Sequence, residues 1–279
     1  MTGKKCIVSA AKLLTAVILV FFTLFPFGCL ILMALRPSEE MMASLSLIPG
    51  SITLSHFSEL FDAAGFDTAL KNSLINSLLS LLFSTVFGLA AAYVLARRRF
   101  RFRLKKPLTF WVLLVRVLPP VAFVVPLYTM FNRVHLLETR LPVILACILI
   151  NIPLIIWFMI SFFQDLPEEI EESGKIDGAS EWQLYCKIVV PLVLPGIAAV
   201  SMLSFIYAWN EYTYSVIFTR SPSNYTIPLA LSVLNTEDNV TNFGLVSAGG
   251  LISFLPILLF VIFAQNYLIS GLSSGAVKE

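Results

Sequence analysis

Residues 141–163 read LPVILACILINIPLIIWFMISFF and contain no charged side chain. A helix rises about 1.5 Å per residue, so this stretch is long enough to cross the roughly 30 Å hydrocarbon layer of a bilayer. Uncharged stretches of this length are typical of helices that lie in lipid. The stretch therefore predicts a membrane-spanning helix.

The rest of the chain has the composition of a membrane protein. Of its 279 residues, 58% are hydrophobic and 13% are charged, whereas soluble domains carry about 25% charged residues. Strand spans would show about ten residues of alternating hydrophobicity, and the sequence has no such pattern. We therefore expect an all-α integral membrane protein with a single transmembrane domain over residues 1–279. Its six spans are expected at about 13–35, 72–96, 107–131, 141–163, 190–218 and 243–270.

The first apolar stretch, residues 13–35, could instead be a cleaved signal peptide. The apolar core of a signal peptide is about 7–15 residues long and is followed by a small-residue cleavage site. This stretch is longer, and it ends at Leu35-Arg36-Pro37. We therefore expect it to be retained as the first span.

The positions of Lys and Arg predict the orientation. With six spans and the N-terminus inside, thirteen Lys and Arg residues fall in inner segments and five in outer segments. Cytoplasmic loops carry the excess of these residues, so both termini are predicted to be cytoplasmic. The largest basic group, residues 97–106, is expected to contact anionic membrane lipid and not nucleic acid.

A polar segment, residues 164–191, separates the fourth span from the fifth. Asp165, with Glu168 three residues later, predicts the start of a first short helix, and Asp177-Gly178 predicts its end. Gly174 would allow a close approach by a neighbouring element.

A second short helix is predicted in the same segment. Ser180 and Gln183 have the spacing of a capping box. The residues that follow form an apolar stripe, made of Trp182, Tyr185, Cys186 and Val189. The segment could be an ordinary amphipathic connector, or it could dock into the groove of a partner.

The polar segment resembles the EAA loop of ABC importer permeases. That loop has the pattern E-A-A-x-x-D-G-A, followed after a spacer by I-x-x-P and a further proline. Here residues 172–179 read ESGKIDGA, residues 188–191 read IVVP, and Pro195 follows. Ser173 and Gly174 replace the two alanines of the pattern, and both are small.

Other stretches resemble the carbohydrate-uptake branch of this family, and within it the smaller permease subunit of maltose transporters. They are Leu118-Pro119-Pro120 with Pro126-Leu127-Tyr128, Trp209-Asn210-Glu211, and the tail GLSSGAVK at 271–278. The resemblance covers nearly the whole chain. It implies a multi-pass permease subunit in a bacterial or archaeal inner membrane, which moves a sugar or oligosaccharide into the cytoplasm.

The resemblance also implies a set of partners. A second permease subunit would complete the pathway, two ATPase subunits would bind ATP and Mg²⁺, and an extracytoplasmic binding protein would deliver the sugar. The residues implied at the ATPase contact are Glu172, Gly174, Asp177, Gly178, Ala179, Ser180 and Trp182 in the loop, and Ser273, Ser274, Gly275 and Lys278 in the tail. We refer to residues 164–191 as the coupling segment.

The chain itself is not expected to be an enzyme. It has no G-x-x-x-x-G-K-[ST] loop for nucleotide phosphates, so ATP hydrolysis is assigned to the partner subunits. Its four cysteines, Cys6, Cys29, Cys147 and Cys186, show no metal-site spacing. We expect neither a metal nor a cofactor in this chain.

Glu211 is an ionisable residue within the fifth predicted span, and such residues are functional candidates. With Trp209, Asn210 and Tyr214 it could hydrogen-bond sugar hydroxyls and stack against a sugar ring. Alternatively it could be structural or gating, paired with Arg116 or with the second permease.

Arg116 lies within the third predicted span, where it could pair with an acidic group or extend toward the lipid headgroups. Pro119 and Pro120 follow it and are expected to break the helix. Because broken helices often line transport paths, both prolines join the candidates for the substrate pathway.

Two other kinds of transporter are alternatives. An ABC permease could carry a solute that is not a sugar. An ion-coupled secondary transporter would show inverted repeats and further carboxylates within its spans, and the sequence shows neither.

Overall fold

The architecture is described from a computed structural model, which covers residues 2–43, 46, 48–62, 65–234 and 242–275. Helices account for 82% of the structure, and the residues in these ranges form no strand. The prediction of an all-α membrane protein is confirmed.

Four helices are long and apolar enough to cross a membrane without interruption. They are α1 (Thr2–Leu35), α4 (Phe66–Ala96), α7 (Leu141–Asp165) and α14 (Phe243–Gly275). Each contains one of the apolar stretches predicted to span the membrane. Each also extends beyond it, because polar residues at the ends of a stretch continue the helix.

The third predicted span is a bent pair of helices. It consists of α5 (Lys105–Val117), the 3₁₀ turn η1 (Pro120–Phe123) and α6 (Val124–Arg133), with a bend of 106°. Leu118 and Pro119 between them have extended backbones. A proline disfavours helical geometry in the residue before it, so Pro119 and Pro120 produce the break that the sequence predicts.

The fifth predicted span, residues 190–218, is not one continuous helix. The structure divides it into α10 (Val190–Leu192), α11 (Leu194–Trp209) and α12 (Thr213–Phe218). The chain bends by 78° where α11 begins, and it leaves the helix again between α11 and α12. If each bent pair is one span, the described residues contain six candidate spans, and otherwise four.

The chain divides into two compact parts, and the first comprises residues 1–66 and 230–255. It contains α1, the short helices α2 (Ser38–Ala43) and α3 (Ser55–Asp62), and the beginning of α14. His56 of α3 is buried, and its Nε2 lies 2.9 Å from the carbonyl oxygen of Arg36. The rings of Phe27 and Phe254 pack 4.9 Å apart and join α1 to α14.

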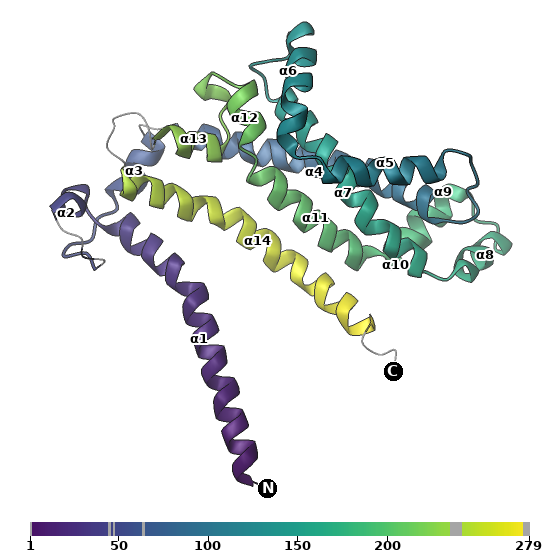
Figure 1. The fold of residues 1–279 in the computed structure, drawn as a ribbon, viewed down its shortest axis with the longest axis horizontal. Helices are drawn as coiled ribbons and strands as arrows, with labels where there is room; N and C mark the ends of the chain where they lie inside the picture. The colour runs from purple at the N-terminus through teal and green to yellow at the C-terminus, as the bar shows by residue number, and fades with distance from the viewer. Residues whose placement is uncertain (1, 44–45, 47, 63–64, 235–241, 276–279) are drawn as a thin grey trace. The chain divides into compact units, whose positions relative to one another are not determined.

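The second part comprises residues 67–229 and 256–279 and contains the candidate sites. Within it α5 and α11 pack against α7 (Figure 1). The coupling segment follows α7 and forms α8 (Glu168–Ile176), α9 (Glu181–Gln183) and the π-helical turn η2 (Leu184–Val189). The remaining short helices are the 3₁₀ turn η3 (Pro222–Asn224) and α13 (Ile227–Leu234), whose last residues belong to the first part.

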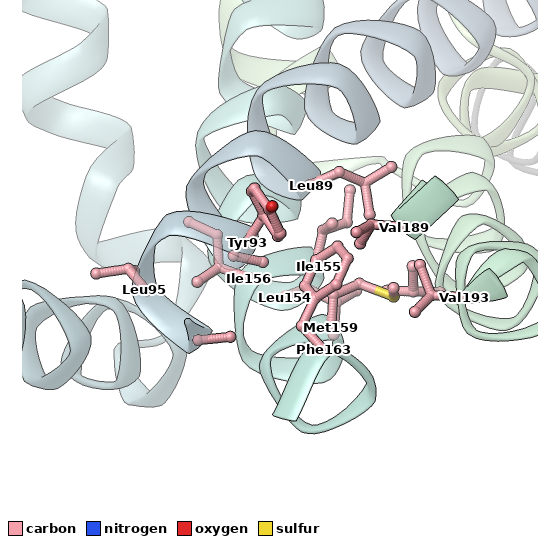
Figure 2. Close-up of a cluster of buried hydrophobic side chains, with 13 residues drawn as sticks. Leu89, Tyr93, Leu95, Leu154, Ile155, Ile156, Met159, Phe163, Val189 and Val193 are labelled. Atoms are coloured by element: carbon pink, nitrogen blue, oxygen red, sulfur yellow. The ribbon is translucent and has the colours of Figure 1, made fainter. Parts of the chain in front are cut away.

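Two buried clusters stabilise the second part. Figure 2 shows the first, in which Tyr93 of α4 lies among side chains of α7 and of the coupling segment, including Met159, Phe163 and Val189. The second joins α6, α7 and α12, with Tyr214 completely buried. The first cluster therefore holds the base of the coupling segment. The second holds the region around two helix breaks, the one between α5 and η1 and the one between α11 and α12.

Candidate functional site

Helix α8 begins later than the sequence predicts. Its cap is Pro167, and Glu168, Glu169 and Glu171 occupy its first turn, where the helix dipole favours carboxylates. The prediction of Asp165 as the cap is wrong, because Asp165 is the last residue of α7. The chain turns after it, since the residue before Pro167 is held extended.

The end of α8 is a Schellman motif built around Gly178. The amide of Gly178 donates to the carbonyl of Lys175, and the amide of Ala179 donates to that of Gly174, both at 3.0 Å. Gly178 has φ +83°, which glycine adopts without strain. An added Cβ would meet no heavy atom within 4 Å. The predicted helix end at Asp177-Gly178 is confirmed, and the space beside Gly178 is open.

Helix α9 begins with the predicted capping box. The amide of Ser180 donates to the side-chain oxygen of Gln183 at 2.9 Å, and the amide of Gln183 donates to the Ser180 hydroxyl at 3.3 Å. These two bonds satisfy donors that a helix start otherwise leaves unpaired. They fix the direction in which the chain enters η2.

Gly174 is buried where α8 packs against η2. A Cβ at this position would lie 2.6 Å from Cδ2 of Leu184 and 2.9 Å from Cδ1 of Ile188. Both distances are shorter than ordinary van der Waals contact. The two halves of the coupling segment therefore approach closely because residue 174 has no side chain.

The coupling segment also presents side chains to its surroundings. Ile176 is 86% exposed and Trp182 is 72% exposed, which is unusual for large apolar side chains. Glu172, Asp177 and Ser180 are exposed as well, and Ala179 is half-buried. Of the predicted apolar stripe, Val189 is buried and Tyr185 and Cys186 are half-buried, so only Trp182 faces outward.

Glu171 is a residue of this site that the sequence analysis does not identify. It is 4% exposed, and its Oε1 lies 2.5 Å from Nε of Arg97, which is itself 2% exposed. Nη1 of Arg97 donates to the carbonyl of Leu166 at 2.7 Å. The sequence signals are a carboxylate in the first turn of α8 and a cation directly after α4, but nothing in the sequence pairs them.

The second carboxylate oxygen of Glu171 has two further partners. It accepts a hydrogen bond from the Tyr93 hydroxyl at 2.9 Å and lies 3.1 Å from Nη2 of Arg99. The same Arg99 nitrogen lies 2.7 Å from Oε2 of Glu181, whose Oε1 lies 2.8 Å from Nζ of Lys175. The guanidinium of Arg99 also stacks on the Tyr93 ring. These ion pairs connect α4, α8 and α9.

Glu211 occupies the second candidate site, at the break between α11 and α12. It is 6% exposed. Its Oε1 accepts from the amide of Tyr214 at 2.6 Å, and its Oε2 accepts from the amide of Ser215 at 3.0 Å. Within the described residues it forms no ion pair with Arg116, which is exposed. The carboxylate therefore satisfies the first amides of α12.

Tyr214 connects the two helix breaks. Its hydroxyl donates to the carbonyl of Pro120 at 3.0 Å, although the two residues are 94 positions apart. Its ring stacks on Phe218, 5.7 Å away. The structure thus brings Tyr214 and Pro120 together, as two of the predicted pathway residues.

The other pathway candidates differ in exposure. Trp209 is 2% exposed and stacks on Phe205, so its ring belongs to the packed interior. Asn210 is exposed, and its side-chain amide donates to the carbonyl of Ile206 at 3.0 Å. Pro119 and Pro120 are exposed too. The side chain of Asn210 is therefore an accessible polar group at the break after α11.

The predicted contact in the tail is described only in part. The backbone of Ser273, Ser274 and Gly275 continues α14. Lys278 lies outside the described residues.

The link between the breaks yields a first prediction. Tyr214→Phe removes one hydrogen bond and keeps the ring, so we expect a stability loss of about 0.5–1.5 kcal/mol. Thermal unfolding in detergent should show a midpoint lowered by a few degrees. Tyr225→Phe is the matched control, because its hydroxyl donates to Arg220 in an exposed loop. An unchanged midpoint for Tyr214→Phe would contradict a connecting role.

Comparison with known families identifies the chain. The family described as the inner membrane component of binding-protein-dependent transport systems matches residues 84–273. The chain belongs to this family. The matched range includes the coupling segment, the breaks on either side of Pro120 and Glu211, and most of α14, and it ends at Ser273.

Relatives of similar length support the assignment. The chain is 34% identical to a probable ABC transporter permease of Sinorhizobium fredii, over 94% of this chain and 92% of that protein. It is 33% identical to the arabinooligosaccharides permease AraQ of Halalkalibacterium halodurans, over 92% of both chains. It is 30% identical to the trehalose permease SugB of Mycobacterium tuberculosis, over 94% of both chains.

A solved structure has the same fold. A chain of a bacterial ABC transporter that imports the polysaccharide alginate aligns with a TM-score of 0.79, over 95% of this chain and 97% of that chain. The sequence identity is 20%. This comparison supports the fold and, at that identity, nothing more specific.

Proposed function

We propose that the chain is the membrane-spanning permease subunit of an ABC importer that moves a sugar or oligosaccharide into the cytoplasm. The observation that carries the proposal is the coupling segment, a closely packed pair of short helices on which Ile176 and Trp182 are exposed. Relatives named for trehalose and arabinooligosaccharides, with full-length alignments, favour a sugar as the substrate.

We further propose a membrane arrangement of six spans with both termini in the cytoplasm. In this arrangement the bent pair of α5 and α6 is the third span, residues 190–218 form the fifth, and α8, α9 and η2 lie outside the spans. The excess of Lys and Arg in the inner segments supports the orientation. The compartment is the inner membrane of a bacterial or archaeal cell.

The orientation is testable with reporter fusions. We expect a phosphatase fused after residue 36 to be active outside the cytoplasm, and one fused after residue 100 to be inactive. A green fluorescent protein fused at the C-terminus should fluoresce, because this reporter folds in the cytoplasm. A fluorescent fusion after residue 36 with an active phosphatase after residue 100 would contradict the orientation.

We propose that the complex contains two ATPase subunits that bind ATP and Mg²⁺, and that the coupling segment docks onto the ATPase. Exposed apolar side chains next to a docking helix are typical of a surface that a partner covers. Glu172, Asp177, Gly178, Ala179, Ser180 and Trp182 would contact the ATPase, together with the tail residues Ser273, Ser274, Gly275 and Lys278. Gly174 would act indirectly, by holding α8 against η2.

We propose that the substrate pathway passes the two helix breaks and is completed by a second permease subunit. Asn210, Pro119 and Pro120 are exposed there and are available to a solute or to that subunit. Trp209, Glu211 and Tyr214 would shape the path from within, because their polar groups or rings are occupied by other contacts. An extracytoplasmic binding protein would deliver the sugar.

Purification of the assembled complex tests this function. We expect the chain to co-purify with a second permease and with ATPase subunits, and ATP hydrolysis to rise when sugar-loaded binding protein is added. A complex stimulated by amino acids or another solute would favour the non-sugar alternative. Transport driven by an ion gradient in the absence of ATPase subunits would contradict the proposal.

A further inference from the structure

Two neighbouring glutamates of α8 have opposite environments. Glu172 is exposed, whereas Glu171 is 4% exposed. A partner protein can reach the first carboxylate and cannot reach the second. Glu171 therefore needs an explanation other than contact with an ATPase.

The contacts of Glu171 lie where the ends of two long helices, α4 and α7, meet the short helix α8. Arg97 directly follows the last residue of α4, and its Nη1 donates to the carbonyl of Leu166, which caps the end of α7. Its Nε pairs with Glu171 of α8 at 2.5 Å. One buried guanidinium thus joins the ends of α4 and α7 to the coupling segment.

Arg99 extends this junction to α9. Its Nη2 lies within ion-pair distance of both Glu171 and Glu181. These two glutamates belong to different helices of the coupling segment, α8 and α9. The Tyr93 hydroxyl donates to the same oxygen of Glu171, while the Tyr93 ring is packed against Phe163 of α7 at 5.6 Å. The ionic contacts are therefore anchored in the hydrophobic cluster of Figure 2.

Stability alone is a poor explanation for this arrangement. Removing two charges from water is costly, and apolar side chains of similar size often stabilise a protein as well or better. The hydrogen bonds beside the ion pair, from the Tyr93 hydroxyl to Glu171 and from Arg97 to the carbonyl of Leu166, differ from apolar packing in being directional. These contacts therefore give α8 a defined position relative to α4 and α7.

We infer that Glu171 is a positioning residue, which with Arg97 and Arg99 forms a latch between the coupling segment and the ends of α4 and α7. The inference rests on the proposed function. It adds a route by which movement of the ATPase subunits reaches the membrane-spanning helices. A displacement of α8 by the ATPase subunits passes through the latch to α4 and α7, both of which have spanning length. Without the latch, less of this displacement reaches α4 and α7.

The test compares two identical substitutions in α8 of the assembled complex. Glu171→Gln removes the buried charge, and Glu169→Gln, which changes an exposed residue of the same helix, is the matched control. Each complex is reconstituted in proteoliposomes with its binding protein and radiolabelled trehalose or arabino-oligosaccharide, whichever the binding protein retains. Co-purified ATPase, ATP hydrolysis and sugar taken up per ATP are measured together.

We expect the Glu171→Gln complex to retain its ATPase subunits and to hydrolyse ATP, but to take up about tenfold less sugar per ATP, the change that corresponds to loss of one charged hydrogen bond. Glu169→Gln should behave as wild type. Normal uptake per ATP in Glu171→Gln would overturn the latch. Loss of the ATPase from that variant, with a folded permease, would also overturn it and assign Glu171 to docking.

A second variant addresses misfolding of Glu171→Gln. Arg97→Met combined with Glu171→Leu leaves no unpaired buried charge in this pair and keeps the volume apolar, so it should fold. We expect the same low uptake per ATP, and normal uptake would overturn the inference. A wild-type complex that binds no ATPase or takes up no sugar would contradict both the proposed function and the latch. Normal uptake per ATP in both the wild type and the variant would contradict the latch alone.

Discussion

Gly178→Arg should give a protein that inserts into the membrane normally but no longer retains its ATPase subunits, so that sugar uptake is lost. The left-handed backbone at φ +83° costs an ordinary residue about 1–2 kcal/mol, which a packed permease should tolerate. The Cβ of the arginine meets no heavy atom of its own chain within 4 Å, because the space beside Gly178 is open. In the complex this is the space that we expect the ATPase to fill.

Two control variants separate strain from obstruction at Gly178. Gly178→Ala introduces the same backbone strain with little added volume, and we expect it to retain most ATPase binding. Gly65→Arg places an arginine on another left-handed glycine in open space, outside the coupling segment, and should bind ATPase normally. Membrane yield and co-purification are measured for all three. If Gly178→Arg co-purified with ATPase at the wild-type level, the coupling segment would not be the docking site.

Replacement of Glu211 should damage folding before it affects sugar recognition. Glu211→Gln turns one of two buried acceptors into a donor that faces a backbone amide, so one charge-assisted bond is lost and a repulsive contact replaces it. Such bonds contribute about 1.5–3 kcal/mol. We therefore expect roughly a tenfold or greater loss of folded protein under mildly destabilising conditions, where 1.4 kcal/mol corresponds to a factor of ten.

Yield, thermal stability and uptake measured on the same Glu211 preparations distinguish the two roles. If the structural role holds, the surviving Glu211→Gln complex transports with an unchanged apparent affinity for sugar. Asn210→Ala is the matched comparison, because its exposed amide is available to a solute, and this variant should weaken uptake while yield is maintained. A Glu211→Gln protein with wild-type stability and greatly reduced sugar affinity would instead assign the carboxylate to the substrate.

Local signals in the sequence predicted most of the fold. Uncharged stretches identify spans because a bilayer excludes charge over their whole length. Pro119 and Pro120 break the third span because a proline restricts the residue before it. Ser180 with Gln183, and Gly178 after α8, act through neighbours within a few residues. Each of these features depends only on nearby sequence.

The break between α11 and α12 was missed because no proline or glycine marks it. The stretch from Trp209 to Tyr214 is apolar enough to continue a helix, apart from Asn210 and Glu211. The carboxylate of Glu211 accepts the first amides of the next helix, and that contact stabilises a new helix start. In the sequence, the polar pair Asn210 and Glu211 is compatible with either a sugar site or a helix cap. Only the contacts in the structure distinguish these two roles.

The Glu171 latch could not be predicted because its partners are distant in sequence. Tyr93 and Glu171 are 78 residues apart and come together only when α4, α7 and α8 have packed. The basic group at 97–106 supports the proposed orientation as a pattern of charge, yet Arg97 within it is buried and paired. A charge pattern does not reveal which members of a cluster are exposed.

The most direct measurement is ATP-driven uptake in a defined system. The chain, its second permease and its ATPase subunits are reconstituted in proteoliposomes with ATP inside, and sugar-loaded binding protein is added outside. The proposed function predicts sugar accumulation that requires ATP hydrolysis and the binding protein together, and that is lost with Gly178→Arg. Accumulation that persists without ATP, or a hydrolysing complex that moves no sugar with its binding protein present, would contradict it.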